Sequence, residues 1–201
     1  MAQPFEDSPR GVVWRIASAV REESADHITL SGVLERLGSR AGGYVLLLLA
    51  LPACMPGVPG MTSIFGVPLA LLGIQMIRGG GARLPDFIAR RPLPRAGALK
   101  ALETAAARLR PLERRLRPRW SLITHPGAER LLGALILALA LLIAVPLPMT
   151  NMAPAFGATI IGLGLAAGDG LVVALGVILG LGSVVFVGGL TLAAVAVALP
   201  A

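Results

Sequence analysis

The chain has 201 residues, of which 55% are hydrophobic and 14% are charged, and its mean hydropathy is +0.78. Ordinary soluble domains carry about 25% charged residues, so this composition excludes them and predicts a membrane protein. Aromatic residues make up only 4% of the chain, beside 25 glycines and 16 prolines, which argues against an outer-membrane barrel with its aromatic girdles. The expected fold class is therefore an all-α membrane protein.

The charged residues are concentrated in two segments. Residues 41–77 contain none, and residues 131–201 contain only Asp169. Residues 78–130 contain thirteen Arg or Lys against four Asp or Glu, a net charge of +9. Such a segment between apolar blocks is typical of a cytoplasmic loop, so we expect a bacterial inner-membrane protein whose N-terminus and basic segment are cytoplasmic. The positive charge is expected to meet anionic lipid headgroups rather than nucleic acid, with a specific anionic ligand as the alternative.

Residues 1–40 are expected to form short amphipathic helices in the cytosol or at the membrane surface. Apolar residues recur at helical spacing from Val12 to Val20, with charged residues opposite them. A second short helix is expected to end at Gly38. His27 lies in the polar gap between the two helices, where we expect a solvated loop residue.

Residues 41–77 form the first apolar block, which is too long for one membrane crossing and short for two. Three prolines and two glycines lie within ten residues near its middle, and an intact helix does not accommodate them. The expected break residues are Pro52, Pro56 and Pro59. The block is therefore predicted to be a re-entrant hairpin that enters and leaves the membrane on one side.

Residues 78–130 are expected to be a cytoplasmic linker. Apolar residues recur every three or four positions from Ala98 to Leu112, beside basic side chains. This pattern predicts an amphipathic helix that lies on an anionic leaflet.

Residues 131–168 repeat the plan of the first block, with expected breaks at Pro146, Pro148 and Pro154. Phe65-Gly66 aligns with Phe156-Gly157, and Gly73 aligns with Gly164 in the same register. Pro59 aligns with Pro148 only after a gap of about two residues. We expect an internal duplication that produces two re-entrant hairpins.

Residues 169–201 are expected to form a C-terminal membrane segment. The run can make one long tilted span, or two short spans that meet near Gly182-Ser183. Gly176 and Gly180 form a GxxxG step, which supports close helix packing or dimerisation. A homodimer is expected, because so few spans enclose a pathway poorly.

Polar residues beside the breaks are the candidate site. Broken backbone survives at membrane depth only where it is buried in protein or lines a wet cavity. In one interpretation these residues cap helix starts and make single interhelical hydrogen bonds, and in the other they line a pathway for an anionic or polyhydroxyl substrate. Asp169 either marks the end of a segment in the headgroups or contributes to the site. The candidates are Thr62, Ser63, Gln75, Thr150, Asn151 and Asp169.

Features typical of enzymes are missing from the sequence. Cys54 is the single cysteine and is expected to be a packing residue, and the two histidines, His27 and His125, lack metal-ligand spacing. No HExxH, GxSxG or P-loop pattern occurs. We therefore expect a protein that is not an enzyme and has no cofactor and no metal.

The order of proline and glycine steps from about residue 28 to 185 resembles the ExoD family of bacterial exopolysaccharide synthesis proteins. The residues that carry the resemblance are Leu51-Pro52, Pro59-Gly60, Phe65-Gly66-Val67-Pro68-Leu69, Gln75, Leu84-Pro85, Arg117-Pro118-Arg119, Pro146-Leu147-Pro148, Asn151, Pro154 and Asp169-Gly170. The resemblance implies an inner-membrane protein of surface polysaccharide production, with polysaccharide-synthesis proteins as partners. Paired hairpin tips favour a transporter or channel, with a non-catalytic membrane scaffold as the alternative.

Overall fold

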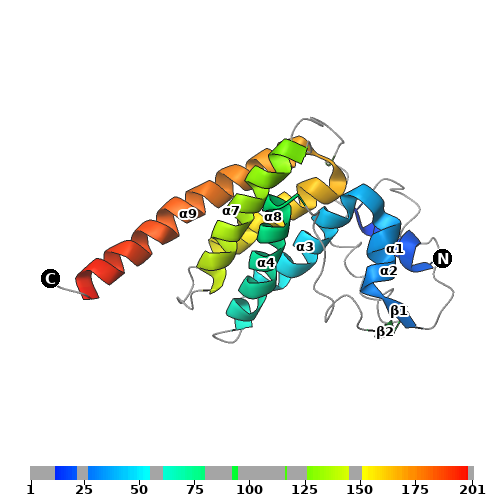
Figure 1. The fold of residues 1–201 in the computed structure, drawn as a ribbon, viewed down its shortest axis with the longest axis horizontal. Coiled ribbons are helices and arrows are strands. Elements are labelled where there is room, and N and C mark those ends of the chain that lie inside the picture. The colour runs from blue at the N-terminus through cyan, green and yellow to red at the C-terminus, as the bar shows by residue number, and fades with distance from the viewer. Residues whose placement is uncertain are drawn as a thin grey trace.

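A computed structural model of the chain describes residues 12–21, 27–54, 61–79, 92–94, 116, 126–144 and 151–198. These residues are almost entirely helical (Figure 1). The elements are α1 (Val12–Arg21), β1 (His27–Thr29), α2 (Leu30–Leu37), the 3-10 turn η1 (Gly38–Arg40), α3 (Ala41–Ala53), α4 (Met61–Ile77), β2 (Pro92–Pro94), α7 (Pro126–Ala144), α8 (Met152–Ala167) and α9 (Gly170–Ala198).

The described residues also include a short antiparallel pairing of β1 with β2, in which His27 lies opposite Pro94. His27 therefore lies in a short strand and not in the expected loop, whereas the solvation of its side chain is outside what the structure describes. Residues 92–94 supply the partner backbone, and because proline has no N–H, the two prolines at the ends of β2 can only accept hydrogen bonds in this pairing. The predicted helix from Ala98 to Leu112 lies outside the described residues.

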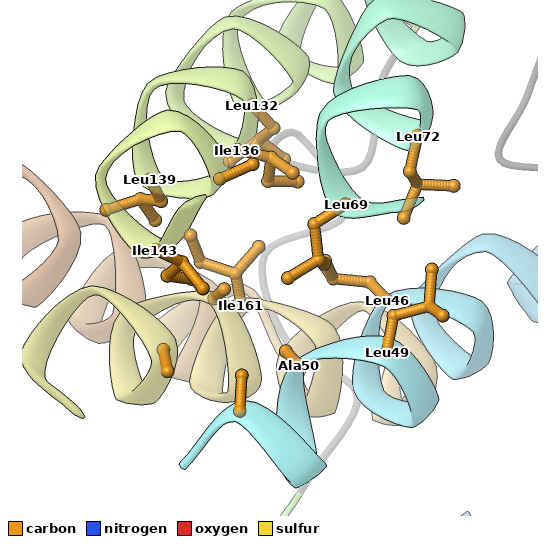
Figure 2. Packing of buried hydrophobic residues seen from close by; sticks show 14 of the residues in the cluster. Leu46, Leu49, Ala50, Leu69, Leu72, Leu132, Ile136, Leu139, Ile143 and Ile161 are labelled. Carbon is orange, nitrogen blue, oxygen red and sulfur yellow. The ribbon is translucent and has the colours of Figure 1, made fainter. Parts of the chain in front are cut away.

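The bundle is built from α3, α4, α7 and α8, with α9 packed along α8 and extending beyond it (Figure 1). Helix α4 packs most extensively on α7, and α3 packs most extensively on α8. Aliphatic side chains from all four helices fill the centre at 0–1% exposure, as Figure 2 shows for Leu46, Leu69, Ile136 and Ile161. The core is therefore shared between the two apolar blocks rather than formed within each.

Two of the prolines expected to break helices are accommodated within them. Pro52 lies in the last turn of α3 and Pro154 in the first turn of α8. Proline is tolerated in a first turn because that N–H has no intrahelical partner, and near a C-terminus it costs only one hydrogen bond. The helices end instead at Ala53 and Ala144, and Pro56, Pro59, Pro146 and Pro148 lie outside the described residues.

Glycines bring two antiparallel helix pairs into backbone contact. A Cβ atom added to Gly162 of α8 would lie 2.8 Å from the backbone nitrogen of Leu47 and 3.2 Å from the carbonyl oxygen of Gly43, both in α3. A Cβ atom added to Gly73 of α4 would lie 2.8 Å from the nitrogen of Leu137 and 2.9 Å from the oxygen of Gly133 in α7. The two pairs, α3·α8 and α7·α4, thus make equivalent contacts, through a backbone nitrogen and a glycine carbonyl oxygen in each pair.

The contacts from the opposite helix of each pair correspond as well. A Cβ atom on Gly43 would meet Leu165 and the nitrogen of Ala166, and one on Gly133 would meet Met76 and the nitrogen of Ile77. Subtracting residue numbers gives a constant offset of 90 between α3 and α7 (133 less 43) and of 89 between α4 and α8 (166 less 77). The buried core positions follow the same offset, since Leu46, Leu49, Ala50 and Ala53 correspond to Ile136, Leu139, Ala140 and Ile143.

This register differs from the one that the Phe-Gly identities predict. The contacts pair Gly73 with Gly162, an offset of 89, whereas the sequence match pairs it with Gly164, an offset of 91. Gly164 packs against α9 instead, where an added Cβ would lie 2.6 Å from the nitrogen of Val173. An offset of 89 also aligns Pro59 with Pro148, so the two-residue gap is not needed.

Helix α9 is one continuous helix of 29 residues. In the ranges that the structure describes, its Gly170–Leu190 part is the one stretch long and apolar enough to cross a membrane, with a mean hydropathy of 2.6 and 33% of the window buried. Its exposed residues include Ile178 (69%), Val185 (76%) and Phe186 (71%). Helices α3, α8 and the Ile64–Ile77 part of α4 are apolar but shorter.

Candidate functional site

The ends of the helices that flank the two breaks lie together. A Cβ atom on Gly66, near the start of α4, would lie 2.9 Å from the backbone nitrogen of Ala144, the last residue of α7. Helix α3 runs antiparallel to α8, so the C-terminal end of α3 lies beside the first half of α8, on the same side of the bundle. We call this side of the bundle the break end, and the opposite side, where α3 and α7 begin, the linker end.

Asn151 is a buried polar residue at the break end, at 7% exposure. It occupies the N-cap position of α8, but its side chain makes no capping hydrogen bond to that helix. Its Nδ2 instead donates to the carbonyl oxygen of Ile143 at 3.2 Å. That carbonyl lies in the last turn of α7, where backbone oxygens have no intrahelical donor, so Asn151 ties the two sides of the second break together.

A second polar contact joins α3 to α8 near the first break. The Sγ of Cys54 lies 3.1 Å from Oγ1 of Thr159, and that hydroxyl donates to the carbonyl oxygen of Ala155 at 2.8 Å. Thr159 was not among the predicted site residues, because a threonine that bonds back to its own helix looks like any other residue of an apolar run. Cys54 is half-buried and serves as a packing residue in this contact, as expected.

The remaining predicted site residues are divided between the two ends of the bundle. Thr62 and Ser63 lie in the first turn of α4, but the structure does not describe their side chains, and Thr150 lies outside the described residues. Gln75 is 13 residues beyond Thr62, or about 20 Å along the helix, and so belongs to the linker end. Asp169 lies at the linker end as well, between α8 and α9. The six predicted residues therefore do not form one cluster.

Asp169 is buried at 3% exposure and organises the turn between α8 and α9. Its backbone N–H donates to the carbonyl oxygen of Gly164 at 2.8 Å, and its Oδ1 accepts from the N–H of Leu171 at 3.1 Å. The preceding residue, Gly168, adopts a left-handed conformation with φ of 73°. An aspartate that accepts a first-turn N–H stabilises a helix N-terminus, so this carboxylate helps to start α9.

Arg40 completes this turn from the start of α3. Its Nη1 donates to the carbonyl oxygen of Ala167 at 3.0 Å, and its guanidinium covers Gly168, where an added Cβ would lie 3.0 Å from Nη2. A cation at the N-terminus of its own helix is unfavourable, whereas one at the C-terminus of the antiparallel partner is favourable. The position of Arg40 is thus explained by α8 and not by α3.

The described polar side chains of this arrangement hold neighbouring helices together through hydrogen bonds. Among the residues that the structure describes, no group of three His, Cys, Asp or Glu side chains could hold a metal ion. At the break end, the amide of Asn151, the hydroxyl of Thr159 and the thiol of Cys54 are each engaged with a neighbouring helix. The fold and this site define a class: a helical protein with a membrane-compatible helix and two broken apolar units.

Comparison with known proteins identifies the family. Residues 15–189 match the model of the family described as exopolysaccharide synthesis, ExoD, so the chain belongs to the ExoD family. The protein ExoD of Rhizobium meliloti is 29% identical over 179 residues, which cover 86% of this chain and 74% of that protein. An uncharacterised protein of Synechocystis is 29% identical over 155 residues, which cover 76% of this chain and 73% of the relative. No solved structure shows a significant match.

Proposed function

We propose that this chain is a multi-pass protein of the bacterial inner membrane that takes part in exopolysaccharide synthesis as a non-catalytic structural component. Membership of the ExoD family supports the process. The exposed apolar side chains of α4, α7 and α9 support the location, since water would penalise so much exposed hydrocarbon surface. The +9 segment supports a cytoplasmic linker end, with anionic headgroups as its contacts.

In this proposal the α3–α4 and α7–α8 units are duplicated re-entrant hairpins that enter from the cytoplasm. Helices of 13 to 19 residues are about 20 to 28 Å long, which is at or below the thickness of a hydrocarbon core of about 30 Å. The constant offsets of 90 and 89 residues support the duplication. The helix ends that flank the two breaks pack against each other, which is the arrangement that burial of a break in an apolar medium requires.

The observation that favours a structural role over a pore is the packing along the shared axis. Leu46, Leu69, Leu72, Ile136 and Ile161 meet there at 0–1% exposure, and they come from all four helices. A polar sugar or ion would lose its hydration at these aliphatic side chains without replacement hydrogen bonds. The chain therefore holds other components through its surface, while its own core stays dry.

A transporter remains a second candidate, favoured by the break end. Asn151 is a buried amide between two broken helices, and transporters commonly bind substrate where helices are interrupted. In that case the aliphatic core would separate to open a path.

One pair of experiments distinguishes the two functions. A deletion strain is complemented with the wild-type gene, and the purified protein is reconstituted into vesicles loaded with radiolabelled glucose and maltoheptaose. Loss of polymer in the deletion strain together with unchanged efflux of both sugars supports the structural component. Efflux that depends on the protein and is reduced by Asn151→Ala, but not by the exposed control Gly182→Ala, supports the transporter.

A further inference from the structure

The linker end contains a second arginine that corresponds to Arg40. With the offset of 90, Arg40 of α3 corresponds to Arg130 of α7, and with the offset of 89, Gly168 corresponds to Gly79. Both glycines are left-handed, with φ of 73° and 72°. Their N–H groups donate to corresponding carbonyls, Gly168 to Leu165 at 3.2 Å and Gly79 to Met76 at 3.0 Å.

Both arginines approach their glycines, but only one of them is engaged. An added Cβ on Gly168 would lie 3.0 Å from Arg40 Nη2, whereas one on Gly79 would lie 3.8 Å from Arg130 Nη2. Arg40 is half-buried and bonded to Ala167, while Arg130 is exposed, and no hydrogen bond from it to α4 is found in the part of the chain described. The carbonyl corresponding to that of Ala167 belongs to Arg78.

We infer that these two sites are equivalent latches between antiparallel helices, one closed at Arg40 and one poised to close at Arg130. This inference rests on the duplication described under the proposed function. Closure moves the guanidinium of Arg130 onto the carbonyl oxygen of Arg78, where the C-terminal end of α4 favours a cation. The α3·α8 pair is then the fixed half of the bundle at the linker end, and the α4·α7 pair is the half that opens and closes.

The two halves differ in sequence in a way that explains the difference in state. Gly168 is followed by Asp169, whose carboxylate adds negative charge next to the Arg40 latch, whereas Gly79 is followed by Gly80. Opposite charges attract strongly in poorly hydrated surroundings, so the acid favours closure at the first site alone. Arg78 and Arg130 are the first and last charged residues of the basic segment, so the Arg130 latch joins the two ends of that segment.

Spin-label distance measurements test the inference on the full chain in lipid vesicles. With Cys54 replaced by Ala, labelled cysteines at Arg78 and Leu131 report the Arg130 latch, and those at Ala41 and Ala167 are the corresponding pair at the Arg40 latch. The 41–167 pair should show one narrow distance. The 78–131 pair should show two populations, and Arg130→Gln should abolish the shorter one.

Two further variants complete the test. Arg40→Gln should give the 41–167 pair a second, longer population, and Arg130→Lys should retain charge but lose most of the shorter population because lysine lacks the planar fork. A single 78–131 distance that Arg130→Gln leaves unchanged would overturn the inference, as would a 41–167 distance unaffected by Arg40→Gln. These distances are measured without reference to polymer production, so failure of the proposed function in the complementation experiment is a separate result.

Discussion

Replacing Gly73 or Gly162 with alanine should destabilise the bundle to a similar extent, because both glycines allow the same close approach of helices. The added Cβ would lie 2.8 Å from a backbone nitrogen in each case, about 0.6 Å closer than ordinary van der Waals contact, and a backbone atom of a packed helix cannot swing aside. Overpacking of this kind costs about 1–3 kcal/mol, from which the better helix propensity of alanine recovers up to about 1 kcal/mol.

A net loss of about 1–2 kcal/mol, in the middle of the resulting range, corresponds to a five- to thirtyfold increase in the opened fraction. Cys54 provides the assay, because it is the single cysteine and is half-buried against Thr159. Its rate of labelling by N-ethylmaleimide is followed in detergent micelles while sodium dodecyl sulfate is increased. Both variants should label at lower dodecyl sulfate concentration than the wild type.

The matched control is Gly182→Ala. Gly182 lies in helix α9 with no atom within 4 Å of an added Cβ, so alanine gains helix propensity there without a steric cost. If Gly73→Ala and Gly162→Ala label no faster than this control, the backbone contact is not close, and the reasoning fails. If one variant labels like the wild type and the other is strongly destabilised, the α3·α8 and α4·α7 pairs are not equivalent.

Three other substitutions give separate expectations. Asn151→Ala should leave the Ile143 carbonyl without its donor and cost about 1–3 kcal/mol in the same labelling assay, whereas a solvated carbonyl would give no change. Gly168→Ala should be more destabilising than Gly79→Ala, since both backbones are left-handed but only the first added Cβ meets a guanidinium at 3.0 Å; equal losses would contradict this. A cysteine at Leu99, in a Cys54→Ala background, should resist an impermeant thiol reagent on intact cells, and labelling from outside would reverse the proposed orientation.

The sequence predicted the helices well, because apolar runs and proline clusters act locally. Apolar blocks gave the positions of α3, α4 and α8, and the proline clusters marked the segments between Cys54 and Met61 and between Ala144 and Asn151. Individual prolines were less informative. Pro52 and Pro154 lie in terminal turns, where the cost of a missing N–H is small, and the sequence does not show which proline of a cluster ends a helix.

The site was harder to predict, because its contacts join helices that are far apart in the chain. Arg40 and Ala167 are 127 residues apart, and nothing local distinguishes Arg40 from other arginines. The correspondence between the two sets of glycine contacts was not predicted, for a related reason. The Phe-Gly identities are short matches in aliphatic sequence, whereas the contacts depend on which glycine faces which helix, and Gly164 faces α9 rather than α3. Gln75 and Asp169 were grouped with Asn151 by polarity alone, although a helix length separates them.

Each of the two units packs mainly on the helices of the other unit, and this has a consequence for biosynthesis. Helices α3 and α4 make their most extensive contacts with α8 and α7, so the glycine faces of the first unit stay unmatched until the second has been made. The 88 residues from Gly80 to Ala167 take roughly 4–18 s to translate at about 5–20 residues per second. During that interval the first unit must be sheltered by the insertion machinery or by lipid. Chains that terminate within the basic segment should therefore be substrates for membrane proteases. The packing of the first unit is completed only when α8 has been synthesised.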